Sequence, residues 1–205
     1  MASLQEHKKN LLLLFFISPI LGLIYGLRTR RSDAIRWSIF VFVFIYGSLL
    51  HPSHMGDGAS HYNNMLAHYP NLSFSQFWNE LIDILSFNPS YGTNDDPYIH
   101  ILTYFVAAVL NSPNLLFVGV ALVFAYFYSG AIIFLMSYVN WKSKYNKFYF
   151  TFFLILLLLW QNPGNMQSIR LGTAIWIVIY GIIGYHKTKK IKYAFLIFLS
   201  PFFHF

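Results

Sequence analysis

The chain has 205 residues, of which 57% are hydrophobic and 20% aromatic, whereas only 10% are charged. A soluble domain carries roughly 25% charged residues, so the composition argues against an ordinary water-soluble fold. The apolar content excludes disorder, and the absence of cysteine excludes a disulfide scaffold or a cysteine-based zinc framework. The net charge of +7 would suit a nucleic-acid partner, but the basic residues gather between apolar segments, which favours a membrane protein and no nucleic acid.

Hydropathy divides the chain into apolar segments that we expect to be helices. The first follows Lys8 and Lys9, as in a cleaved signal peptide, but no small-residue cleavage site comes after it. Arg28-Thr-Arg30-Arg31 follows instead, which is a poor substrate for translocation, so we interpret this segment as an uncleaved helix. The predicted segments are Leu11–Leu27, Ala34–Leu50, Tyr98–Leu110, Leu115–Val139, Phe148–Trp160, Leu171–Tyr185 and Ile191–Phe205.

The basic residues predict how these helices are oriented. Of 14 Lys and Arg residues, four lie at 28–36, three at 140–147 and four at 187–192, whereas 51–97 contains none. The positive-inside rule therefore predicts three cytoplasmic loops and an extracytoplasmic 51–97. Segment 98–110 is too short to span, so we expect a re-entrant or interfacial helix on the outer face.

This arrangement predicts an all-α polytopic membrane helix bundle of about six transmembrane helices. We expect a single domain, 1–205, in a membrane, with both ends of the chain outside. In the outer loop, apolar residues recur at helical spacing opposite Asn79, Glu80 and Asp83, which predicts an amphipathic helix on the outer leaflet. The apolar residues of this helix are Phe74, Phe77, Trp78, Leu81, Ile82, Ile84 and Leu85.

Arg170 is the charged residue that the loops leave over. It stands about five residues into the segment opened by Gln161-Asn-Pro163-Gly164-Asn165, near the outer interface, where we expect Asn165 to cap the helix. A guanidinium beside a helix N-terminus makes a site for an anion, phosphate in particular. The alternative is an arginine that reaches to lipid phosphates, but charged groups in a membrane are costly and usually functional.

Three further residues could carry chemistry at the outer face. Asp57 could take a proton from a sugar hydroxyl or bind one, or it could be a solvated loop residue or helix cap. Asp96 precedes Pro97, a common helix start, so capping is its alternative. His204, near the outer end of the last segment, could face a polar cavity or lie at the interface.

The spacing of His54, Asp57 and His61 would place three metal ligands on one helical face. Gly56 and Gly58 weaken a helix here, and no zinc-enzyme motif supports such a site. We therefore expect no metal and no cofactor.

The whole pattern resembles the EpsG family of bacterial exopolysaccharide-assembly membrane proteins. The similarity rests on Ser18-Pro19 in an early helix, Gly56-Asp57 with Tyr62, and Asp96-Pro97 before a short helix. Its strongest part is Ser168-Ile169-Arg170-Leu171-Gly172-Thr173-Ala174, followed by Lys189-Lys190 and Ser200-Pro-Phe-Phe-His204. Leu171-Gly172 stands where the family usually has Gln and Ala. Because such relatives are longer, the resemblance implies a chain truncated at its C-terminus.

The resemblance implies a role like that of Wzy-type polymerases, which join polyprenyl-pyrophosphate-linked oligosaccharides at the outer face of the membrane. Arg170 would then bind pyrophosphate, His204 or Asp57 would act as the base, and Tyr62 and Asp96 would contact sugar. Expected partners are the lipid-linked oligosaccharide, membrane lipids and other polysaccharide-assembly proteins. A non-catalytic assembly subunit and a lipid-linked sugar transporter are the alternatives.

Overall fold

The computed structural model describes residues 4–28, 32–50, 57–88, 96–138 and 168–204. These residues form nine α-helices and no strand, so the predicted all-α class is confirmed for them. Short 3₁₀ segments lie at Pro113–Leu115 and Ser200–Phe203, and a π-helical turn at Phe105–Val109 continues α6. The α-helices are α1 (Leu4–Ile17), α2 (Pro19–Arg28), α3 (Ser32–Ser48), α4 (Asp57–His68), α5 (Phe74–Leu85), α6 (Pro97–Tyr104), α7 (Leu116–Met136), α9 (Ile169–Thr188) and α10 (Ile191–Leu199).

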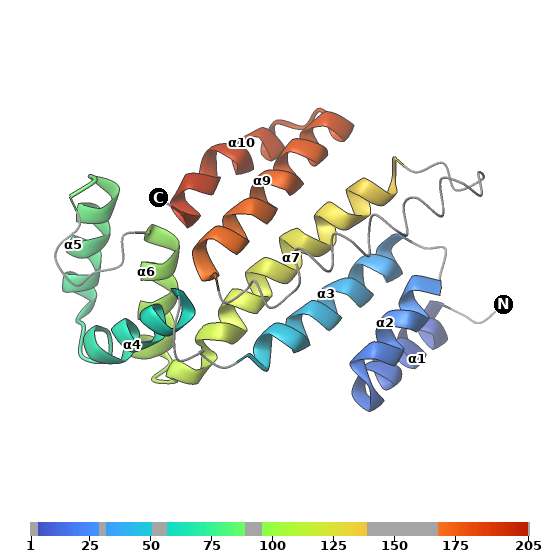
Figure 1. Ribbon diagram of the computed structural model, residues 1–205, viewed down its shortest axis with the longest axis horizontal. Coiled ribbons are helices and arrows are strands. Elements are labelled where there is room, and N and C mark those ends of the chain that lie inside the picture. The colour runs from blue at the N-terminus through green and yellow to red at the C-terminus, as the bar shows by residue number, and fades with distance from the viewer. Residues whose placement is uncertain (1–3, 29–31, 51–56, 89–95, 139–167, 205) are drawn as a thin grey trace.

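Three long helices, α3, α7 and α9, form the body of the molecule together with the shorter α10. α7 packs between α3 and α9, and α10 lies against α9 (Figure 1). Tyr138, just after α7, hydrogen-bonds His186 near the end of α9, so these two helices run in the same direction. One face of α7 is fully buried, including Val120, Phe124 and Tyr128, as expected for a helix that packs between two others, whereas Leu122 and Tyr126 are exposed.

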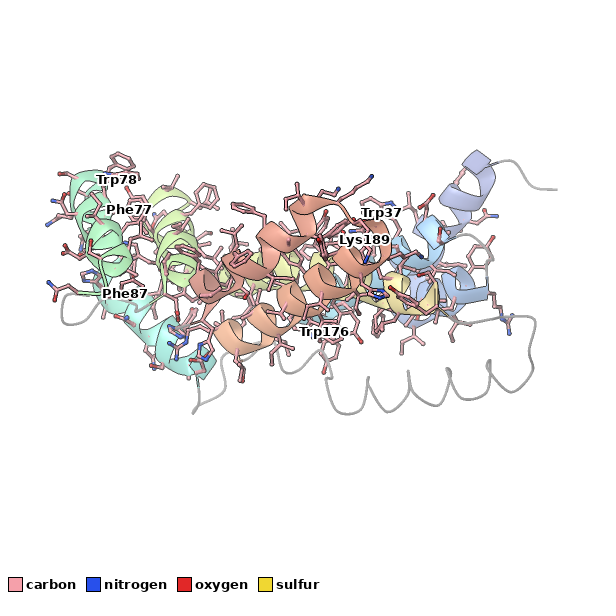
Figure 2. All side chains as sticks on the ribbon, turned by 90° about the horizontal axis from the view of Figure 1, so that it is seen from above. Trp37, Phe77, Trp78, Phe87, Trp176 and Lys189 are labelled. Atoms are coloured by element: carbon pink, nitrogen blue, oxygen red, sulfur yellow. The ribbon has the colours of Figure 1, made fainter. Side chains whose placement is uncertain are left out.

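The end of the body opposite Tyr138 and His186 carries a cap made of α4, α5 and α6 (Figure 1). α5 begins where the sequence predicts, because Ser73 and Gln76 form a reciprocal capping box at its N-terminus. Its apolar residues divide between two faces: Phe77, Leu81 and Ile84 are buried, whereas Phe74 and Trp78 are exposed. Figure 2 shows Phe77 and Trp78 on this cap, far from Lys189 at the end of α9.

The first apolar segment differs from its prediction. Instead of one helix over 11–27, the structure has α1 and α2, interrupted at Ser18 and in contact with each other. Pro19 explains the break, because proline has no N–H to donate and its ring clashes with the carbonyl four residues earlier. Gly22 lets the two helices approach, since a Cβ there would lie 2.5 Å from the ring of Phe15.

Two of the described helices are long and apolar enough to cross a membrane. They are Pro113–Met136 and Ile169–Thr188, close to the predicted segments 115–139 and 171–185. Shorter apolar helices cover Pro19–Arg28, Pro97–Val109 and Ile191–Phe203. The predicted segment 148–160 lies outside the described residues. The expected six crossings are thus not confirmed by the helix lengths.

Candidate functional site: a charged cluster at the start of α9

Arg170 lies at the very beginning of α9. The helix starts at Ile169, and Ser168 occupies the N-cap position without a side-chain capping bond. Asn165, the residue expected to cap this helix, lies outside the described residues. Arg170 stands in the first turn, where backbone N–H groups have no partner within the helix.

The guanidinium of Arg170 contacts two carboxylates from distant parts of the chain. Its Nε donates to Asp57 Oδ1 at 3.2 Å, and a terminal nitrogen lies 3.2 Å from the same oxygen. The other terminal nitrogen donates to Asp96 Oδ2 at 3.0 Å. Three residues singled out in the sequence, Asp57, Asp96 and Arg170, are therefore in contact. We call these three residues and His61, which is described below, the charged cluster.

Helix starts supply all three of these charged residues. Asp57 is the first residue of α4, and Asp96 is the N-cap of α6, immediately before Pro97. The alternative interpretation of Asp96 as a helix cap is confirmed by its N-cap position, but its side chain makes no capping bond and reaches Arg170 instead. Its backbone carbonyl does accept the first helical bond, from His100 N at 3.1 Å.

The cluster is only partly open to solvent. The side chain of Asp96 is fully buried, whereas those of Asp57 and Arg170 are 26% and 24% exposed. Burial by itself would raise the pKa of Asp57, but the hydrogen bond from His61 and the charges of His61 and Arg170 outweigh it, so this pKa lies below its ordinary value. Asp57 is therefore ionised at neutral pH.

The charge balance of the cluster differs from that of a lone arginine. Two carboxylates and one guanidinium leave one formal negative charge when the imidazole is neutral. A guanidinium has five N–H groups, and at most three are directed to these carboxylates. Within the part of the chain that the structure describes, Arg170 therefore keeps N–H groups for a ligand, and the partly exposed carboxylate of Asp57 can accept hydrogen bonds from hydroxyl groups.

His61 is a member of this cluster that the sequence analysis did not assign. Its Nε2 donates to Asp57 Oδ1 at 3.0 Å from the next turn of α4, and its side chain is 10% exposed. The glycines at 56 and 58 argued against a helix here, but α4 forms from Asp57 onward. The i, i+4 spacing of Asp57 and His61 was the signal that could have identified this pair.

The structure does not bring the other two predicted residues into the cluster by a direct contact. The hydroxyl of Tyr62 donates to Asn114 Oδ1 at 3.0 Å, which ties α4 to the start of the α7 segment. His204 Nδ1 is buried and has no hydrogen-bond partner within the described part of the chain. The ring of Phe203, the preceding residue, packs 4.6 Å from that of Tyr98, which places His204 at the same end of the molecule.

Metal ligation and homology add nothing to this geometry. Across 4–28, 32–50, 57–88, 96–138 and 168–204, no group of three or more histidine or acidic side chains is arranged to hold a metal ion. His54, the third residue of the metal spacing considered above, lies outside these residues. No protein-family model, curated protein or solved structure matches the chain.

Proposed function

We propose that this protein takes part in bacterial exopolysaccharide or capsule synthesis as a polymerase-like membrane glycosyltransferase. In this proposal the charged cluster handles a polyprenyl-pyrophosphate-linked oligosaccharide at the outer face of the cytoplasmic membrane. The observation that carries the proposal is the meeting of Arg170, Asp57 and Asp96, which are 113 and 74 residues apart in sequence. A protein with so few charges places three of them in one contact, beside a helix start.

The cluster has groups suited to both parts of such a reaction. The departing pyrophosphate carries negative charge, and the remaining N–H groups of Arg170 and the first turn of α9 can donate to its oxygens. The carboxylate of Asp57 can accept hydrogen bonds from sugar hydroxyls, as Tyr62 could at the neighbouring turn. Asp96, whose side chain is fully buried, would hold Arg170 in place. Because the carboxylates neutralise Arg170, recognition of phosphate would depend on the directions of the N–H groups more than on net charge.

The acceptor hydroxyl also needs a base, for which the sequence offers His204 or Asp57. The lowered pKa of Asp57 makes it a weak proton acceptor. His204 suits this task better, since its Nδ1 is buried without a partner among the described residues. The reaction would invert the anomeric carbon, with the proton moving from the hydroxyl to His204 and the pyrophosphate leaving with its bonding electrons.

The lipid part of the substrate would lie beside the cluster. A wholly apolar groove between α5, α6 and the 3₁₀ turn begins at Pro97, next to Asp96. Its lining is apolar throughout, which suits a hydrocarbon chain. The groove is lined by Leu81, Leu85, Pro97, Tyr98, Ile101, Leu102, Phe105, Phe202 and Phe203.

This function requires the cluster to lie outside the cell. In the six-crossing topology, with both ends outside, the charged cluster falls on the outer side and the basic turn at 187–192 on the cytoplasmic side. The two ends of α9, which hold Arg170 and Lys187, then lie on opposite sides of the membrane.

The experiment is to measure the amount and the chain length of the polymer in cells whose only copy of the gene carries Arg170→Ala or Arg170→Lys. We expect the amount of polymer to fall at least about 100-fold for Arg170→Ala, which is the scale of losing one transition-state donor group. Arg170→Lys should be partly impaired, because an ammonium lacks the planar fork of N–H groups. Lys187→Ala, on the exposed far end of the same helix, is the matched control and should leave the polymer unchanged.

Membrane insertion of every variant is checked by detergent extraction and immunoblotting. Normal polymer from stably inserted Arg170→Ala would overturn the proposed role. If the protein were an assembly subunit, deleting the basic turn at 187–192 would impair polymer synthesis instead. If it were a transporter, the Arg170 variants would accumulate lipid-linked precursor on the cytoplasmic side. Either outcome would favour that function over the glycosyltransferase.

A further inference from the structure

A second polar cluster lies inside the cap and has no role in the proposed reaction. His100, on α6, is fully buried, and its Nδ1 lies 2.8 Å from the hydroxyl of Tyr69, just after α4. Its Nε2 lies 3.1 Å from the backbone carbonyl of Phe77 on α5. One imidazole therefore joins three parts of the cap, and the ring of Phe77 stacks on it at 5.0 Å.

These contacts define the protonation state of His100. A carbonyl oxygen can only accept, so Nε2 must carry a proton and donate to Phe77. In a neutral imidazole, Nδ1 is then an acceptor, and the Tyr69 hydroxyl donates to it. The neutral form thus satisfies both contacts, whereas a second proton on Nδ1 would face the Tyr69 hydroxyl and force it to turn.

The cap in turn determines where the acids of the charged cluster lie. Asp57 begins α4, the helix that leads to Tyr69, and Asp96 stands one helical turn before His100. The His100 amide donates to the Asp96 carbonyl, so the two residues share the first turn of α6. Loosening the junction at His100 therefore frees the elements that present both carboxylates to Arg170.

We propose that neutral His100 is a positioning residue that holds α4, α5 and α6 together over Arg170, and that its protonation releases this cap. The effect of this release on catalysis rests on the proposed function, whereas the role of His100 in holding the three helices together does not. Mild acid would then reduce activity through the position of Asp57 and Asp96 rather than through their own titration.

The charged and titratable groups around His100 come from α5 and from the end of α4. Glu80 of α5 has a carboxylate oxygen 3.9 Å from Nε2, and His68, at the end of α4, donates to Glu80 at 3.0 Å. The hydroxyl of Tyr69 completes this side. Two other elements that pack on α6, α7 and the turn Ser200–Phe203, contain no acidic or basic side chain. From α9, Arg170 reaches Asp96, one helical turn before His100.

The direction of the pH effect follows from this setting. Burial lowers the pKa of His100 below its ordinary value of 6.5; the Phe77 carbonyl and Glu80 oppose this only in part, and His68 adds to it. The open cap consequently binds more protons than the closed cap below about pH 6.5. The contribution of His100 to closure is complete above that pH and is lost as the pH falls through the lower, closed-state pKa.

The test measures the distance between cap and body without any enzymatic assay. The chain has no cysteine, so Ser75→Cys on α5 and Ile182→Cys on α9 give a unique pair of sites for spin labels, and both positions are exposed. Electron-electron distance measurements are made on the full chain in lipid nanodiscs between pH 8 and pH 5. We expect one narrow distance distribution at pH 8 and a broadened one at pH 5.

Two variants identify the group that titrates. His100→Gln keeps an N–H donor for Phe77 but cannot be protonated, so its distance distribution should be the same at both pH values. Tyr69→Phe removes a hydrogen bond that favours the neutral imidazole and should move the transition upward by about one pH unit. His186→Gln, at the exposed Tyr138 pair on the far end of α9, is the control and should leave the transition unchanged.

The outcomes separate this inference from the proposed function. A pH transition that persists in His100→Gln, or a Tyr69→Phe transition at the wild-type pH, would overturn the role of His100. Absence of any transition in the wild-type protein down to pH 5 would overturn it as well. None of these results bears on whether Arg170 binds pyrophosphate, which the polymer measurement decides.

Discussion

The two ends of the helical body are held together by different interactions. At the end that carries the cap, Arg170 joins α9 to α4 and α6 through charged contacts. At the other end, α9 packs on α7 and α10 through aromatic rings seated against glycine. A Cβ at Gly184 would lie 2.5 Å from the Tyr193 ring and 2.9 Å from that of Phe134, so only glycine allows these helices to approach so closely.

This difference indicates where function lies. Close packing around glycine stabilises helices in a membrane without placing a charge there, and small residues are the usual means. Charged contacts are more costly, so a structure that can pack with rings and glycines does not need them for cohesion. The charged cluster at the cap end is for that reason the better candidate for a binding site.

The largest effect on stability is expected at Asp96. Because its carboxylate is fully buried, Asp96→Ala leaves the guanidinium without its most buried partner and should cost about 3 kcal/mol of unfolding free energy. Thermal unfolding of the purified protein in detergent measures this loss. The more exposed acid serves as the comparison: Asp57→Ala should cost about 1 kcal/mol. Equal losses would contradict the assignment of Asp96 as the buried anchor.

A somewhat smaller effect is expected at the glycine-packed end. Gly184→Ala inserts a methyl group into the rings of Tyr193 and Phe134 and should cost about 2 kcal/mol by the same unfolding measurement. Ile182→Ala, on the exposed side of the same helix, should change stability little. If the two substitutions were equivalent, the close approach at Gly184 would not stabilise this end.

The smallest effect concerns acid. Because the pKa of Asp57 is depressed in the folded state, its stabilising contribution is present above about pH 4 and is lost as the pH falls through the folded value. The difference in melting temperature between wild type and Asp57→Asn should therefore shrink from pH 5 to pH 3. A difference that stayed constant over this range would show that the Asp57 carboxylate is not held ionised by His61 and Arg170.

Local patterns predicted much of the fold. The extent of α5 was predicted from the helical spacing of its apolar residues, and α7 from its long apolar run. The break between α1 and α2 was missed because a hydropathy average does not register the missing N–H of Pro19. α4 was missed because Gly58 lowers helix propensity, whereas contacts made by the rest of that helix outweigh it.

The candidate site was only partly predictable for a different reason. Chemical type and position near a helix start sufficed to select Arg170, Asp57 and Asp96 one by one. Their contacts join residues 113 and 74 positions apart, and no local pattern encodes such a pairing. The junction of His100 with Tyr69 is similar, since it depends on how α4, α5 and α6 pack.

The role of the charged cluster as the functional site is tested most directly by comparing the polymer made per molecule of inserted protein in Arg170→Ala and Gly184→Ala cells. We expect Arg170→Ala cells to retain most of the inserted protein but to make little polymer from it. Gly184→Ala should lower the amount of protein yet leave the polymer made by each molecule close to wild type. If polymer simply followed protein amount in both strains, the charged cluster would be a structural contact and not the functional site.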